Sequence, residues 1–212
     1  MSVICSICTH EGIVLATDSR ETINKDLGVH IDTTTKLFEL KKMNFGVAAC
    51  GDTGIDGKRV YAFLESFENE ILLSEQRIIE TVADKLSWEL SNAKVSDSTA
   101  LLLGGFSNNK PYVYRVDNTK ATLLRDSINI EGVYACKLPP EICNKVSDTT
   151  TLASAIALAK VIIEATIDFD ETCNNTKATC GGDIDILVIK EKWMRFFAKK
   201  DIDTDFILFG KE

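Results

Sequence analysis

The first 18 residues, MSVICSICTHEGIVLATD, restrict the possible folds more than any other stretch of the chain. Apolar residues dominate two short runs, 2–8 and 12–18, and Glu11-Gly12 separates them. Short apolar runs on either side of a glycine are typical of two strands joined by a tight turn. We therefore expect a β-hairpin at the very start of the chain, with Asp18-Ser19-Arg20 as its polar exit.

Ser2 is the second residue of the chain. Methionine aminopeptidases remove Met1 when the next side chain is small, and this removal would make Ser2 the first residue. An N-terminal serine carries a hydroxyl nucleophile and an α-amino group, and the free amine can act as the base for that hydroxyl. The start of the first predicted strand is therefore a candidate nucleophile position.

Four segments carry a resemblance to a known family: GIVLATDSR at 12–20, KLFEL at 36–40, FGVAACGD at 45–52 and CGGDIDILVIKEKW at 180–193. They resemble β-type subunits of the proteasome, which are N-terminal nucleophile hydrolases. The resemblance implies an α+β fold, a four-layer αββα sandwich, in one domain over residues 1–212. Counting back from Asp18 puts the family's nucleophile on Ser2, where the family usually has threonine.

The resemblance also implies the residues around this nucleophile. Lys36 matches the family lysine beside the nucleophile, where a cation favours loss of the hydroxyl proton. Asp18 matches the carboxylate that pairs with this lysine. The family binds the oxyanion with a backbone N–H at a Gly-rich turn, and here that donor is the N–H of Cys50 or of Gly51.

The supporting residues match the family less closely. The family aspartate near the end of the third helix corresponds to Asp168 or Asp170. Cys180 stands before Gly181-Gly182 where the family has serine, and the segment 131–134 lacks the serine of the family's Gly-Ser-Gly loop. For substrate binding the resemblance implies Thr22, Ala48 and Asp52, and an inward-pointing Asp52 would favour a basic substrate side chain.

Hydrophobic periodicity outlines the remaining elements. We expect a loop or weak hairpin over 20–35 and strands at 36–41 and 44–50. Helical spacing of apolar residues predicts helices over 54–73, capped by Thr53, over 76–94, with Ser74 as a capping candidate, and from Thr149 or Thr150 onward. Strands fill 98–136, Pro139-Pro140 open a short helical piece, and 170–182 form a polar loop. The last two strands are expected at 184–189 and 194–198.

Composition excludes several classes of function. The net charge of −8 argues against a nucleic-acid surface, and no apolar run approaches the roughly 18 residues that span a membrane. Seven cysteines without an export signal indicate reduced thiols in a cytoplasmic protein. Cys5 and Cys8 form a C-x-x-C pair, but residues three apart on a strand point to opposite faces. Only two histidines, His10 and His30, are present, so we expect no metal and no cofactor.

Three functions remain open at this stage. The first is an N-terminal-serine peptidase inside a homo-oligomeric ring, acting on peptides or unfolded proteins, with an ATP-dependent unfoldase as a possible partner. The second is a non-catalytic shell subunit, and the third is an amidohydrolase with the same nucleophile but no ring. For the ring we expect apolar residues outside the main helical stripes to meet a neighbouring subunit: Leu72, Leu73 and Trp88.

Overall fold

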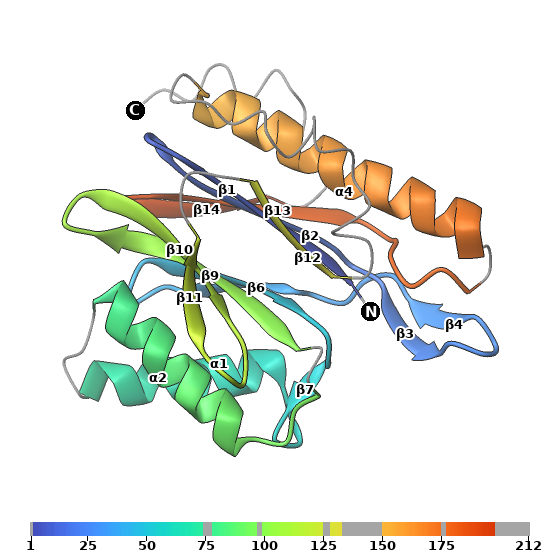
Figure 1. Ribbon diagram of the computed structural model, residues 1–212, viewed down its shortest axis with the longest axis horizontal. Coiled ribbons are helices and arrows are strands. Elements are labelled where there is room, and N and C mark those ends of the chain that lie inside the picture. The colour runs from blue at the N-terminus through green and yellow to red at the C-terminus, as the bar shows by residue number, and fades with distance from the viewer. Residues whose placement is uncertain are drawn as a thin grey trace.

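The computed structural model describes residues 2–73, 78–96, 99–124, 128–132, 150–174 and 177–197. Two five-stranded sheets face each other, and all their neighbouring strands run antiparallel (Figure 1). The first sheet has the order β12 (Ile128–Gly132), β1 (Val3–Thr9), β2 (Gly12–Asp18), β13 (Ile184–Lys190) and β14 (Trp193–Phe197). The second has the order β11 (Ala121–Leu124), β10 (Lys110–Val116), β9 (Ala100–Ser107), β6 (Phe45–Cys50) and β5 (Leu37–Leu40).

Helices cover both outer faces of this pair of sheets (Figure 1). The helix α4 (Leu152–Asn174) packs on the first sheet through buried apolar side chains that include Ala159 and Ile163. The helices α1 (Val60–Leu73) and α2 (Ile79–Asn92) pack on the second sheet. The order helix, sheet, sheet, helix confirms the predicted four-layer αββα sandwich.

Strand alternation explains why the starting hairpin is buried throughout. Every residue of β1 and β2 is buried, because one face of the sheet meets α4 and the other meets the second sheet. Cys5 belongs to the apolar cluster under α4, whereas Cys8 belongs to the cluster between the sheets. The two thiols of the C-x-x-C pair therefore diverge, as predicted.

Helix α1 begins later than the sequence indicated. The segment 54–59 forms a small hairpin, β7 (Gly54–Ile55) and β8 (Lys58–Arg59), instead of the first helical turn. Its turn places Asp56 and Gly57 at φ values of 50° and 74°, in the left-handed region that favours glycine and short polar residues. The prediction that Thr53 caps a helix starting at 54 is therefore wrong.

Other boundaries differ by a few residues. Residues 20–35 contain the predicted weak hairpin, β3 (Glu21–Asn24) paired with β4 (Val29–Ile31). Helix α4 extends to Asn174, so the polar segment expected to be a loop from residue 170 begins as helix. Ser74, Pro139-Pro140 and Thr149 lie outside the described residues. Among the helices that are described, none combines the length and the apolar character needed to cross a membrane.

Candidate active site

A buried ion pair lies where the exit of β2 meets the start of β5. The Lys36 Nζ donates to Asp18 Oδ1 at 2.8 Å and to the backbone oxygen of Arg20 at 2.5 Å. The Asp18 side chain is fully buried and that of Lys36 is 7% exposed. The predicted lysine–aspartate pair is thus present in the structure, enclosed by protein on nearly all sides.

Asp18 also accepts hydrogen bonds from three backbone N–H groups. Val3 donates to Oδ1, and Arg20 and Gly181 donate to Oδ2, at 3.1, 3.3 and 3.1 Å. Burial raises the pKa of the Asp18 carboxyl, while the Lys36 ammonium and the N–H donors act in the opposite direction. Val3 follows the candidate nucleophile directly, so this one carboxylate fixes both the lysine and the start of β1.

Ser2 immediately precedes β1 and is 6% exposed. It lines the same cavity as Lys36, and β12 runs closely alongside it. At Gly132, φ is 121° and an added Cβ would lie 1.9 Å from the Ser2 backbone oxygen. Glycine is therefore required at position 132 for β12 to approach the start of the chain this closely.

Cys50 ends β6 and Gly51 begins the turn that follows, where the sequence placed the Gly-rich turn. The Ala49 N–H donates to the Lys36 oxygen at 2.9 Å, so the residues next after Ala49 lie beside the lysine. Gly51 has a φ of 100°, which demands glycine, and both residues line the cavity of Ser2. Burial raises the pKa of the Cys50 thiol to about 11, so this thiol stays protonated near neutral pH.

The structure distinguishes between the two candidate aspartates of α4. Asp170 is fully buried, and its Oδ2 accepts the N–H groups of Thr179 and Cys180 at 2.6 and 2.7 Å. Asp168, two residues earlier on the same helix, is exposed. Asp170 thereby holds the turn whose next N–H, from Gly181, reaches Asp18, whereas Asp168 takes no part in these contacts.

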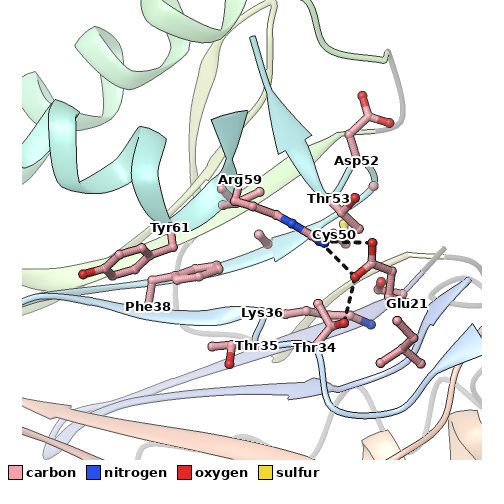
Figure 2. A pocket seen from close by; sticks show the side chains of 15 residues that line it. Glu21, Thr34, Thr35, Lys36, Phe38, Cys50, Asp52, Thr53, Arg59 and Tyr61 are labelled. Carbon is pink, nitrogen blue, oxygen red and sulfur yellow. Dashed lines mark hydrogen bonds and ion pairs between the residues drawn. The ribbon is translucent and has the colours of Figure 1, made fainter. Parts of the chain in front are cut away.

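A cavity of about 460 Å³ opens beside Ser2 and Lys36 (Figure 2). Two of the expected substrate-binding residues, Thr22 and Ala48, are not among the residues that line it. Ala48 is fully buried in the cluster between the sheets, and Ala49, which points the other way, lines the cavity. Glu21, the residue before Thr22, likewise lines the cavity in place of Thr22. In both cases the residue that lines the cavity is the immediate neighbour, on the same strand, of the residue that was expected there.

Asp52 lies at the cavity, but its carboxylate is already bound. It accepts from the Ser96 N–H at 2.6 Å and from the Ser96 hydroxyl at 3.0 Å. Figure 2 shows the Asp52 carboxylate directed away from Lys36 and Glu21. Two residues that the sequence reasoning missed, Glu21 and Arg59, form an ion pair across the cavity instead. The acidic Glu21 directly after the motif GIVLATDSR was the one available signal.

Two facing sheets with helices on both outer faces, and a lysine–aspartate pair beside the first residue of a central strand, define the fold class of N-terminal nucleophile hydrolases. The chain belongs to the proteasome subunit family, whose family model, described as Proteasome subunit, matches residues 2–181. Subunits of this family assemble into rings. A search of curated proteins found no match.

Proposed function

We propose that this chain is a peptidase of the proteasome β type, which cleaves peptide bonds through Ser2 once Met1 is removed. The observation that carries this proposal is the position of Lys36: bound to Asp18, it lies on the wall of the cavity that Ser2 also lines. A fixed ammonium beside a hydroxyl favours the alkoxide form, which makes the hydroxyl a better nucleophile.

The chemistry follows from these groups. The α-amine of Ser2 takes the hydroxyl proton, and Oγ attacks the carbonyl carbon of the substrate. The oxygen that becomes negative accepts the backbone N–H of Cys50 or Gly51. The α-ammonium returns the proton to the leaving amine, and water then hydrolyses the ester to free Ser2. Asp18 and Lys36 stay charged and in place during these steps. Asp170 positions the turn that binds Asp18.

The expected substrate is an unfolded polypeptide that enters a homo-oligomeric ring, delivered by an ATP-dependent unfoldase. The side chain before the cleaved bond would enter the cavity beside Lys36, whose volume of about 460 Å³ is sufficient for one large residue. A ring protects the cell from a nucleophile that attacks any exposed peptide bond. Family membership supports the ring.

Covalent labelling tests the proposed nucleophile. A peptide epoxyketone should add its full mass to the protein that begins at Ser2, and peptide mapping should place the adduct on Ser2. Ser2→Ala and Lys36→Ala should each abolish the adduct. Labelling that persists in Ser2→Ala, at Cys50 for example, would assign the reaction to another group. The raised pKa of the Cys50 thiol argues against that outcome.

A second candidate function is a non-catalytic shell subunit. Cys180 replaces the family serine before Gly181-Gly182, and the segment 131–134 contains none either, so two groups that orient the family's amine are missing. A protein that begins at Ser2, assembles into a ring and forms no adduct would be such a shell. An adduct on a protein that forms no ring would instead indicate an amidohydrolase.

A further inference from the structure

The cavity beside Ser2 contains an acidic side chain that is almost fully buried. Glu21 is 9% exposed and begins β3. Its Oε2 accepts from the Thr34 hydroxyl at 2.8 Å, and both carboxylate oxygens accept from the Arg59 Nη1, at 3.2 and 3.1 Å. Burial alone would raise the pKa of the Glu21 carboxyl, but the bonds from Thr34 and Arg59 lower it below its ordinary value. Glu21 is thus a charged carboxylate that forms an ion pair with Arg59.

The arginine reaches Glu21 from the mouth of the cavity. Arg59 ends the β7–β8 hairpin, and its side chain is 69% exposed. In Figure 2 the guanidinium points toward Glu21 and away from Tyr61. A substrate arginine that entered from solvent would place its guanidinium on the same carboxylate oxygens. Arg59 therefore occupies the position that a basic substrate side chain would need.

The other charged side chains that the structure describes on the cavity wall, Lys36 and Asp52, also have hydrogen-bond partners. Lys36 is bound to Asp18, and the Asp52 carboxylate is bound to Ser96. The uncharged lining includes four large apolar or aromatic side chains, Ile31, Phe38, Val60 and Tyr61, together with the hydroxyl groups of Thr34, Thr35 and Thr53. A charged substrate side chain would have to displace one of these partners or enter without a counterion at Glu21, and a nearly buried carboxylate such as Glu21 is costly to separate from its partner.

We propose that Arg59 is a specificity-determining residue, which neutralises Glu21 and restricts the cavity to uncharged apolar substrate side chains. This inference rests on the proposed peptidase function. It replaces the basic preference expected from an inward-pointing Asp52, because the carboxylate that faces the cavity is Glu21. Removal of the Arg59 guanidinium would leave Glu21 as a buried carboxylate open to a substrate arginine.

Matched peptides test the preference. Three substrates differ only in the residue before the cleaved bond, which is leucine, arginine or glutamate. The assembled protein that begins at Ser2 should cleave the leucine peptide at least about tenfold faster than the arginine peptide, in kcat/KM. Arg59→Ala should shift the arginine-to-leucine ratio toward arginine by about tenfold or more. Adding Glu21→Gln to Arg59→Ala should remove that shift.

Two further variants separate this effect from general ones. Lys58→Ala removes an exposed positive charge from the same hairpin and should leave the ratio as in the parent. Arg59→Gln keeps most of the side-chain length and should behave like Arg59→Ala, which guards against a local collapse of the hairpin. An unchanged ratio in both Arg59 variants, or a parent protein that prefers arginine, would overturn the proposal.

A binding measurement in the Ser2→Ala background needs no catalysis. Benzamidine, a small aromatic cation, should raise the melting temperature of Ser2→Ala/Arg59→Ala and leave Ser2→Ala and Ser2→Ala/Arg59→Ala/Glu21→Gln unshifted. If benzamidine binds in this pattern while no peptide is cleaved, the neutralisation of Glu21 by Arg59 stands and the peptidase function fails. If peptides are cleaved but the arginine-to-leucine ratio is unchanged in the Arg59 variants, the peptidase function stands and the role of Arg59 fails. If benzamidine does not bind and no variant cleaves, the role of Arg59 is refuted.

Discussion

At the scale of single residues, Asp18 connects more of the site than any other described side chain in it. Its two oxygens accept from Val3, Arg20, Lys36 and Gly181, which belong to four separate segments. A fully buried carboxylate of this kind is costly to disturb, because each donor left behind loses its partner away from water. The site and the stability of the fold therefore depend on the same group.

A double-mutant cycle would measure this dependence. We expect Asp18→Asn to lower the free energy of unfolding by about 3–5 kcal/mol, because Lys36 is left as a buried cation without a counterion. Lys36→Met together with Asp18→Asn should cost at least about 1 kcal/mol less than the sum of the single changes. Urea titration of each variant at one protein concentration gives these values, and strict additivity would show that the pair is not coupled.

Asp185 gives the fold a pH dependence. Its neighbours on β13, Ile184 and Ile186, pack toward α4, so Asp185 points into the space between the sheets. Burial, together with the charge of Asp183, raises the pKa of Asp185 from 3.8 to about 6. Between these two values the unfolded chain is ionised while the folded one keeps its proton. Stability contributed by this group is therefore lost as pH rises from about 4 to 6.

Asp185→Asn should remove this loss. The variant should match the parent near pH 4 and be more stable above pH 6, by about 1–2 kcal/mol after allowance for the partial exposure of the carboxyl. Chemical denaturation at several pH values measures the difference. Asp26→Asn, at an exposed position in the β3–β4 turn, serves as the control and should follow the parent curve. A difference that does not change with pH would contradict the assignment.

At the scale of elements, the sequence predicted the strands and helices well and their boundaries less well. The hairpin β1–β2, the pair β5–β6 and the helix stripes all have clear periodicities, because each element buries one or two whole faces. The 54–59 hairpin was missed because the apolar spacing of α1 masks a local turn at Asp56-Gly57. Ala49 and Glu21 line the cavity in place of Ala48 and Thr22, because a shift of one residue on a strand reverses the face. The pairing register of a strand depends on tertiary contacts, and it cannot be derived from a single sequence.

Helix α4 provides a matched pair of aspartates for an element-scale test. Asp170→Asn should lower the free energy of unfolding by about 1–3 kcal/mol, because the N–H groups of Thr179 and Cys180 lose a charged acceptor. The exposed Asp168→Asn should stay within about 0.5 kcal/mol of the parent. Amide hydrogen exchange should show faster exchange at residues 179–181 in Asp170→Asn alone. Equal effects of the two changes would refute the role given to Asp170.

At the scale of the whole molecule, the exposed apolar residues favour assembly. Of the three residues predicted to meet a neighbour, Leu73 and Trp88 are 87% and 56% exposed, whereas Leu72 packs partly buried against the core under the second sheet. The β3–β4 hairpin exposes four more apolar residues: Ile23, Leu27, Val29 and Ile31. Family membership supplies the reason for such surfaces, since rings form through head-to-tail contacts. The sequence identified the family and the Lys36–Asp18 pair, but the Glu21–Arg59 pair depends on the β3–β4 and β7–β8 hairpins meeting in space.

Light scattering of the protein at micromolar concentration tests the assembly. We expect a homo-oligomer of at least about six subunits, since a closed ring needs several head-to-tail contacts. Replacing Trp88 by glutamate should lower the mass if this helix face meets a neighbour, whereas Glu80→Gln on the same helix should not. The mass of a single chain for the unmodified protein would exclude the ring.

The contacts around Asp18 can form only late in the synthesis of the chain. Gly181 donates to a carboxylate that lies 163 positions earlier in the chain, and Cys180 accepts from Arg20 across 160 positions. A ribosome adds residues at about 5–20 per second, so the first strand emerges many seconds before the segment that completes its surroundings. During that interval the serine at the start of the chain has no finished site around it. The contacts that surround Asp18 are thus complete only when nearly all of the chain has been made.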